Sequence, residues 1–569
     1  MKFRLDRQAW VFIIILLAAG FLRLANLGEI GLQSDPAHYA MRALGWFDFL
    51  AGEGQTSPVV WLNKIPWWGN LSFHDHPPLA FAAMFLSLNI FADTDFFALL
   101  PSLLASLGTV IMLFVIFSRL NRPTEGIFAS GLFAISSYAV WTARSGYIES
   151  LEIFFITACV GAFLLYLDGR QRYFIYAFGL AALALLTKYT AVFLIPAILI
   201  FLLFSRRQVF LTKKFWLGVM VFVIVLAPVV VYNFYTFKTT GHFDAALTSL
   251  LGLKTQDFSV LEGRGVGWNF LTGLRDVAVV VSRNISFPFL ALFSFATLGV
   301  LWRLVRRRLE PGLGFVFLVL CWAIVMFVFL GGGADRYLPV LLPALVILTA
   351  FEVVQWWRFF SSRPLLRKSF TIVLVLAACF ELFYAVNTNV VRRPVGKENL
   401  TYSSQRFYVK GFVELDRYLR KNAAGVLGER RRLTEFNKAA VKYPVAGRQV
   451  VLIDERLDWF SRTWYFDRYF YYYNQPYIYF RDLLEAIPEG NTDIYSFLRD
   501  AGATGVWLVL GKGGNLNLQF ESYNSLIRDL EKGIMDLNIT PAKDIHDYRD
   551  ELVVRVYHLT FKQRHAPGL

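Results

Sequence analysis

The feature that most constrains this chain is a series of apolar segments of roughly 17 to 22 residues, close to the length needed to cross a hydrocarbon core of about 30 Å. Eleven such segments lie near residues 10–27, 97–118, 125–141, 148–167, 173–187, 189–205, 215–236, 287–303, 314–331, 336–356 and 368–386. Hydrophobic residues make up 56% of the 569 residues, more than a soluble core could hide. The sequence therefore predicts a polytopic α-helical membrane protein with about eleven transmembrane helices.

A twelfth apolar segment, residues 78–92, is only about fifteen residues long, and it decides the direction of every later helix. If it does not cross, five basic clusters lie on the same side as the basic N-terminus, as the positive-inside rule requires. The clusters are Arg119 and Arg122, Arg170 and Arg172, Arg206 to Lys214, Arg303 to Arg308, and Arg358 to Lys368. We therefore expect an interfacial or re-entrant helix at 78–92 and a cytoplasmic N-terminus. The first apolar segment is followed by no small-residue cleavage pattern, so we expect it to be retained.

The chain changes character after about residue 387, where helical and strand-like patterns alternate. The expected helices are Phe412 to Lys421, Asp493 to Asp500 and Ser522 to Lys532, and the expected strands are Val450 to Asp454, Gly505 to Leu510 and Leu552 to Leu559. The pattern predicts two domains. The first is a transmembrane module over residues 1–386 with outer loops at 28–96 and 237–286, and the second is an extracytoplasmic α/β domain over residues 387–569.

The formal charge of +15 does not indicate nucleic-acid binding, because the Lys and Arg residues fall in short clusters between apolar segments rather than on one basic face. The three cysteines, Cys159, Cys321 and Cys379, all lie inside apolar segments without metal-type spacing. Neither a disulfide framework nor a thiolate metal site is therefore predicted.

Asp35 lies a few residues beyond the first predicted helix, in the outer loop. Partial desolvation at the lipid–water boundary would make its carboxylate a stronger base than a free aspartate. The alternative is that Asp35 caps a helix that begins at Pro36, since Asp followed by Pro is a common helix start.

Later in the same loop, His74, Asp75 and His76 place two imidazoles and a carboxylate at consecutive positions. Such a group could bind a divalent cation or hold an anion, and we expect His242 in the second outer loop to join Asp75 if a metal is bound. The alternative is that these residues cap the helix that follows and interact with lipid headgroups.

A third group lies at the outer ends of later helices. Glu149 and Glu152 share one helix face and enter an apolar segment, where ionisable side chains are functional candidates by default. The alternative for this helix start is an ion pair between Arg144 and Glu149. Lys188 and Arg336 lie on the outer side against the positive-inside rule, which suggests an anionic ligand such as a phosphate in the membrane plane. Snorkelling of these two cations to lipid phosphates is the alternative.

Taken together and in this order, these residues resemble the GT-C superfamily of membrane glycosyltransferases, of the protein O-mannosyltransferase and aminoarabinose:lipid A transferase type. The resemblance covers roughly residues 10–360 and, loosely, the tail. The matching motifs are Asp35 with Tyr39, Asp75-His76-Pro77-Pro78-Leu79, Arg144 to Leu151, Leu185 to Lys188, and Arg336-Tyr337-Leu338-Pro339 through Pro343. Each motif alone is short, but five in register on the predicted outer side are specific.

The resemblance implies that an aspartate in the first loop deprotonates an acceptor hydroxyl, which displaces polyprenyl phosphate from the sugar with inversion. It assigns the base to Asp35. It also implies phosphate contacts from Lys188, Arg336, Arg144 and His76, and further acidic site candidates at Asp75 and Glu149. Nearby cations would stabilise the charge that builds on the leaving phosphate. No cofactor is required by such a reaction, and a divalent metal ion at Asp75 and His242 stays open.

Three residues depart from the family pattern. Pro36 follows the aspartate where many relatives carry glutamate, and Glu149 stands where aspartate is common. His76 stands where the aminoarabinose transferases carry lysine, so a phosphate contact there would require a protonated imidazole. These departures favour a bacterial relative with another sugar or acceptor.

The expected function is sugar transfer from a polyprenyl-phosphate donor to a lipid, glycan, protein or small hydroxyl- or amine-bearing acceptor. The expected location is the outer face of a bacterial plasma membrane. Membrane lipids are expected as further partners, and nucleic acid is not. A transporter or lipid flippase is the main alternative, although it would be expected to show a charged path that reaches the inner face. A non-catalytic scaffold or a lipid-binding sensor is a third.

Overall fold

The computed structural model describes residues 7–29, 31–32, 34–46, 66–72, 76–251, 253, 270–331, 335–403, 411–423, 429–430, 445–486, 494–513, 516 and 524–561. The chain divides into two compact units. The helical unit comprises Met1–Leu27 and Thr56–Phe407, and the sheet unit comprises Gly28–Gln55 and Tyr408–Leu569. Residues 28–55 of the first predicted outer loop thus belong to the same unit as the tail.

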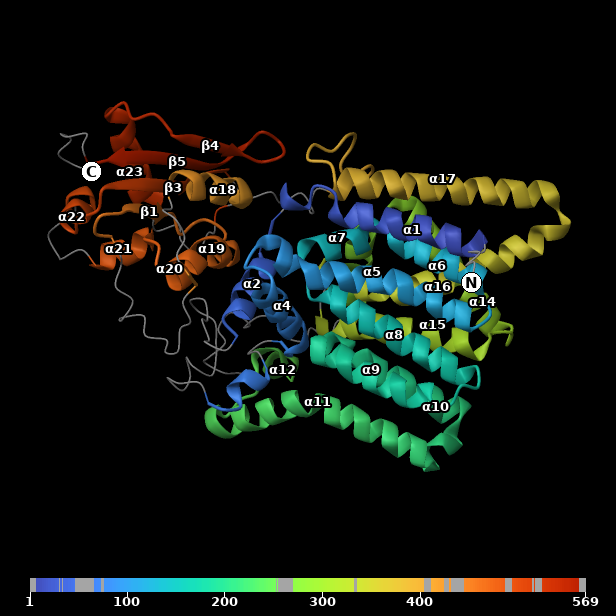
Figure 1. Ribbon diagram of the computed structural model, residues 1–569. Helices are drawn as coiled ribbons and strands as arrows, with labels where there is room; N and C mark the ends of the chain where they lie inside the picture. The colour runs from blue at the N-terminus through green and yellow to red at the C-terminus, as the bar shows by residue number, and fades with distance from the viewer. Residues whose placement is uncertain are drawn as a thin grey trace, which may run out of the picture. The chain divides into compact units, whose positions relative to one another are not determined.

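The helical unit consists mainly of long apolar helices (Figure 1). Its elements are α1 (Arg7–Leu24), η2 (Gly69–Leu71), α4 (Leu79–Ile90), α5 (Asp95–Arg119), α6 (Pro123–Ile135), α7 (Ser137–Ser145), α8 (Glu149–Leu167), α9 (Tyr173–Thr187), η3 (Tyr189–Phe193), α10 (Leu194–Ser205), η4 (Arg207–Leu211), α11 (Lys213–Thr240), α12 (Ala245–Leu250), α13 (Phe270–Asn284), α14 (Phe287–Val305), α15 (Pro311–Met326), η6 (Phe327–Gly331), η7 (Leu338–Leu341), α16 (Leu342–Phe359), η8 (Phe360–Ser362) and α17 (Pro364–Asn389). A short turn, η1 (Leu27–Glu29), follows α1.

Within the described residues, eight helices are long and apolar enough to cross a membrane, and the pair α6–α7, bent by 57°, makes nine if it forms one span. The chain is therefore a multi-pass membrane protein. Eight or nine of the about eleven predicted spans are thus present among the described residues. The two remaining predicted spans, 173–187 and 189–205, are helical but shorter: α9 has 15 residues, and η3 with α10 covers Tyr189–Ser205. At a rise of about 1.5 Å per residue, α9 is shorter than a core of about 30 Å, and whether these two segments cross stays a prediction.

The short helices arise because the backbone is interrupted at identifiable residues. Lys188 is extended, with φ −158° and ψ 139°, and separates α9 from η3. Ser136, with φ −55° and ψ 115°, separates α6 from α7, and Gly146, in the left-handed region at φ 79°, ends α7 just before α8 begins at Glu149. Helices α8 and α9 pack side by side, as do α9 and α11 (Figure 1). These interruptions place Lys188 and Glu149 at neighbouring helix ends.

The segment at 78–92 forms α4, a helix of 12 residues that packs on α5. Its length agrees with the prediction of a helix too short to span, and its depth in the membrane stays a prediction.

The sheet unit is built on a five-stranded mixed sheet with strand order β2-β1-β3-β5-β4. Its elements are α2 (Asp35–Leu44), α18 (Phe412–Asn422), β1 (Gln449–Ile453), α19 (Trp459–Arg462), η11 (Thr463–Asp467), α20 (Arg468–Tyr473), β2 (Tyr477–Tyr479), α21 (Phe480–Ala486), α22 (Ile494–Asp500), β3 (Gly505–Gly511), α23 (Asn524–Asp536), β4 (Lys543–His546) and β5 (Leu552–Thr560). Strand β1 pairs in parallel with β2 and β3, whereas β5 runs antiparallel to β3 and β4. The predicted helices and strands of the tail are confirmed as α18, α22, α23, β1, β3 and β5.

A close approach between α13 and η6 gives a stability prediction. A Cβ atom added at Gly273 would overlap with the carbonyl oxygen of Val328, so the backbone would have to shift. We expect Gly273→Ala to lower the free energy of unfolding by about 1–3 kcal/mol, the usual cost of overpacking. Gly20→Ala in α1 is the matched control, because a Cβ there meets open space. Thermal unfolding of the two purified variants in detergent tests this, and equal transition temperatures would contradict it.

Candidate active site

A buried ion pair joins two of the predicted site residues. Lys188 Nζ donates a hydrogen bond to Glu149 Oε1, and their side chains are 6% and 0% exposed. Glu149 is the first residue of α8, and Lys188 follows the last residue of α9. Burying two charges costs desolvation energy that a hydrophobic pair would not, so such pairs are weak evidence for stability. The alternative pairing of Glu149 with Arg144 is not what the structure shows.

Tyr337 links Lys188 to Arg336. The ammonium of Lys188 lies 4.4 Å from the centroid of the Tyr337 ring. Arg336 Nη2 donates to the Tyr337 hydroxyl at 3.0 Å, and its guanidinium carbon lies 5.0 Å from the same ring centroid. The structure therefore brings together the two cations that lie on the outer side in the predicted topology, through one tyrosine that each contacts.

The turn that carries Arg336 is held by two other helices through Asp335. Asn284, the last residue of α13, donates its side-chain amide to Asp335 Oδ1 at 2.5 Å. The hydroxyl of Tyr138 on α7 donates to the backbone carbonyl of Asp335. Arg336 is thus positioned by α7 and α13 rather than by sequence neighbours alone.

A second acidic residue and a hydrogen-bonded cluster surround the ion pair. Glu152, one helical turn after Glu149, accepts a hydrogen bond from Thr190. Tyr189, next to Lys188, donates its hydroxyl to the carboxylate of Asp244. Asp244 in turn accepts from Asn233 of α11 at 2.9 Å.

Asp244 ties the predicted second outer loop to α11. This residue was not identified from the sequence. Its carboxylate also accepts the backbone N–H of Leu247 at 2.7 Å, as an N-cap of α12 does. The Asp-Ala-Ala-Leu segment that begins at Asp244 was a signal for such a cap.

Arg144 lies near the end of α7 and is directed to α1 instead of to the ion pair. Its Nη1 donates to the backbone carbonyl of Leu22 at 3.0 Å, and the side chain is buried. The contact ties α7 to α1. A phosphate contact from Arg144 stays a prediction.

The predicted metal ligands give no metal site in the described part of the chain. Asp75 lies outside the described residues. His242 is buried, with Nδ1 2.7 Å from the carbonyl oxygen of Phe243. His76 stacks on Phe81 with ring centroids 6.1 Å apart. Among the residues that the structure describes, no group of three or more His, Cys, Asp or Glu side chains is placed to hold a metal ion.

Asp35 belongs to the sheet unit, where it is the first residue of α2. The cap position is therefore taken by Ser34, whose side chain makes no capping hydrogen bond, and not by Asp35 as the alternative reading required. Ser34 has φ 57° and ψ −137°, a conformation that costs a residue with a side chain about 1–3 kcal/mol.

Two residues of the tail, Ser461 and Tyr465, hold the strained turn before Asp35 through hydrogen bonds. The backbone N–H of Leu32 donates to the Tyr465 hydroxyl at 3.0 Å, and that of Ser34 donates to Ser461 Oγ at 3.0 Å. Ser461 Oγ itself donates to the carboxylate of Asp458, which caps α19. These contacts, all within the sheet unit, fix the start of α2 and hence the backbone of Asp35.

Comparisons with known proteins agree with this architecture. Crystal structures of two enzymes superpose on the chain. ArnT from Cupriavidus metallidurans, bound to undecaprenyl phosphate, matches with a TM-score of 0.54 at 13% identity over 97% of this chain and 98% of that protein. The Archaeoglobus fulgidus oligosaccharyltransferase matches with a TM-score of 0.50 at 14% identity over 90% of this chain and 70% of that protein. The fold is therefore that of ArnT: apolar helices with a C-terminal α/β region.

Sequence comparison gives a family match over part of the chain. Residues 75–232 match the family model described as dolichyl-phosphate-mannose-protein mannosyltransferase. YkcB of Bacillus subtilis (strain 168), which is named provisionally as a mannosyltransferase, is 23% identical over 203 residues. That alignment spans 35% of this chain and about a quarter (26%) of the length of YkcB. The resemblance predicted from the motifs is confirmed over residues 75–232, where the chain is similar to this family.

Proposed function

We propose that the chain is a glycosyltransferase that takes its sugar from a polyprenyl-phosphate donor. The observation that carries the proposal is the convergence of Lys188 and Arg336 on Tyr337, because two cations at adjacent helix ends suit a phosphate in the membrane plane. An ammonium has three donors, so Lys188 can hold a phosphate oxygen while it remains paired with Glu149. The family match and the fold of ArnT support the same donor chemistry.

In the proposed reaction, the Asp35 carboxylate removes the proton from an acceptor hydroxyl or amine. The acceptor atom attacks the anomeric carbon, and the bond between that carbon and the phosphate oxygen breaks with inversion. The electron pair leaves with polyprenyl phosphate, whose new negative charge is stabilised by Lys188 and Arg336. No redox partner or nucleotide enters this balance. We place the reaction at the outer face of a bacterial plasma membrane.

The experiment that tests this function is transfer of radiolabelled sugar from a panel of polyprenyl-phosphate donors by the purified full-length protein, with envelope extracts as acceptors. We expect one donor to yield labelled product that mass spectrometry then identifies. Absence of transfer across the panel by folded protein would contradict the proposal. Movement of labelled lipid across a vesicle membrane in the same preparation would favour the flippase alternative.

The contacts that fix the turn before Asp35 give a further prediction. Ser461→Ala removes the acceptor of the Ser34 N–H, and Tyr465→Phe removes that of the Leu32 N–H. We expect either variant to lower kcat about tenfold to a hundredfold, as small misplacements of a reacting group do. The KM for the donor should stay unchanged, because neither residue is proposed to bind the phosphate.

Ser461→Thr is the control for this prediction, since it keeps the hydroxyl and should retain most of the activity. An equal loss in Ser461→Ala and Ser461→Thr, or a rise in KM without a fall in kcat, would show that Ser461 does not act through Asp35.

A further inference from the structure

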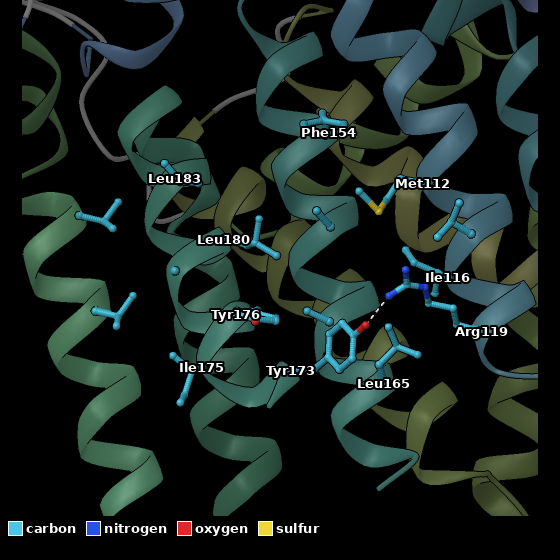
Figure 2. Close-up of a pocket in the computed structure, with 16 residues that line it drawn as sticks. Met112, Ile116, Arg119, Phe154, Leu165, Tyr173, Ile175, Tyr176, Leu180 and Leu183 are labelled. Atoms are coloured by element: carbon cyan, nitrogen blue, oxygen red, sulfur yellow. Dashed lines mark hydrogen bonds between the residues drawn. The ribbon is translucent and has the colours of Figure 1, made fainter. Parts of the chain in front are cut away.

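We propose that a cavity among α5, α8, α9 and α11 binds one anionic glycerophospholipid, with an acyl chain in the cavity and the phosphate at Arg119 and Tyr173. The cavity has a volume of about 640 Å³, within the range of roughly 300–1,000 Å³ typical of small-molecule sites. Figure 2 shows it between the helices, with the side chains that line it. This site is independent of the proposed sugar transfer.

The cavity wall is apolar along most of its length. Its lining includes Met112, Phe154, Leu165, Leu180 and Val221. On α8 the lining runs from Phe154 to Leu165, about 16 Å of helix at the usual rise per residue. A wall of this length and composition suits a single alkyl chain, because apolar side chains along the wall can make dispersion contacts with it.

The polar groups of the cavity gather at one end. Arg119 is the last residue of α5, and Tyr173 is the first residue of α9. Arg119 Nη1 donates to the Tyr173 hydroxyl, as the dashed line in Figure 2 marks. A guanidinium carries five N–H donors, so further donors of Arg119 are available for a phosphate. Within the described part of the chain, no carboxylate forms an ion pair with Arg119.

Other charges near this end favour an anion over a zwitterion. The guanidinium of Arg172 lies 5.2 Å from the Tyr173 ring centroid, and α11 starts with Lys213 and Lys214. Asp168, the acidic residue in the turn between α8 and α9, lies 3.6 Å from Arg170. Basic groups at the end of an intramembrane pocket attract anionic headgroups, whereas the choline of a zwitterionic lipid would meet like charge.

The position of the polar end separates this lipid from the proposed donor. Helix α8 begins at Glu149, and Leu165 lies about 24 Å further along the helix axis. Helix α9 likewise begins at Tyr173 and ends next to Lys188. A phosphate at Arg119 is therefore at the opposite helix ends from a phosphate at Lys188.

The test uses the purified, delipidated full-length protein and native mass spectrometry. Phosphatidylglycerol and phosphatidylcholine with identical acyl chains are offered in parallel, with a polyprenyl phosphate and inorganic phosphate as further arms. We expect one phosphatidylglycerol to be retained with a preference of at least about fivefold over phosphatidylcholine, the effect of roughly one basic residue at a membrane surface. Arg119→Gln should abolish this preference. Arg306→Gln, a cation after α14 that does not line the cavity, should keep it.

A cavity-filling variant locates the site. Gly179 lines the cavity, and a Cβ there already meets Val221 Cγ1 at 3.3 Å. Gly179→Leu should therefore reduce retention of phosphatidylglycerol, and Ala158→Leu gives a second variant should the first fail to fold. A photoreactive acyl chain should label α9 and α11. Equal retention of both lipids, an unchanged preference in Arg119→Gln, labelling elsewhere, retention of inorganic phosphate alone, or displacement of phosphatidylglycerol by polyprenyl phosphate would each overturn the proposal.

Discussion

Replacement of Asp35 by asparagine is expected to lower kcat for sugar transfer by about 10²–10⁴-fold, the usual contribution of a general base. The amide has nearly the same shape as the carboxylate but cannot take a proton from the acceptor. Asp35 lies in the first turn of α2, so loss of its charge should cost at most about 1 kcal/mol of helix stabilisation. Steady-state transfer of radiolabelled sugar by the purified variant measures the effect, and the donor KM should change little.

The matched control for Asp35→Asn is Asp544→Asn in the same unit. Asp544 accepts from Arg555 at 2.7 Å in a partly exposed pair between β4 and β5, and the proposed reaction does not use it. We expect its activity to stay near that of the wild type. If Asp35→Asn transferred sugar at the wild-type rate, Asp35 would not be the base. The proposed enzyme class would still stand.

Much of the fold could be predicted from the sequence because apolar length and hydrophobic periodicity are local signals. The long spans and the tail strands β1, β3 and β5 are such cases. Hydropathy does not report the length of each helix, however, and α9 ends after 15 residues because the backbone of Lys188 is extended. Strands β2 and β4, with three and four residues, are too short to show a period.

The grouping of residues 28–55 with the tail could not be predicted for a different reason. Contacts such as Leu32 with Tyr465 join positions 433 residues apart, and no local pattern encodes them. No sequence pattern near Tyr465 indicates its hydrogen bond to the turn before Asp35.

The candidate site was predictable where a residue violates a general rule. Lys188 and Arg336 were identified because they break the positive-inside rule, and the structure places both against Tyr337. The partner of Glu149 was harder to predict, since both Arg144 and Lys188 were available in sequence. The packing of α8 against α9 makes Lys188 the ion-pair partner of Glu149. Asp244 was not identified from the sequence because two of its partners, Tyr189 and Asn233, lie in other elements.

Removal of the charge of Lys188 should separate its catalytic role from its structural role. Lys188→Met leaves Glu149 buried without its cation, which typically costs about 3–5 kcal/mol of stability. It should also lower kcat by about 10²–10³-fold, as the loss of one transition-state donor does. The double variant Lys188→Met with Glu149→Gln removes both charges, so its unfolding temperature should return toward that of the wild type. Its sugar transfer should nevertheless remain as low as in Lys188→Met, because the donor to the leaving phosphate is still absent.

A control pair of similar chemistry makes this comparison decisive. Arg303 Nε donates to the buried Glu352 at 2.7 Å between α14 and α16, and neither residue enters the proposed reaction. Arg303→Met should therefore destabilise the protein without lowering the kcat of the folded fraction, and adding Glu352→Gln should restore the unfolding temperature. If the double variant at Lys188 and Glu149 regained transfer along with its unfolding temperature, the ion pair would be a packing element only. Phosphate stabilisation would then have to come from Arg336 and residues beyond this pair.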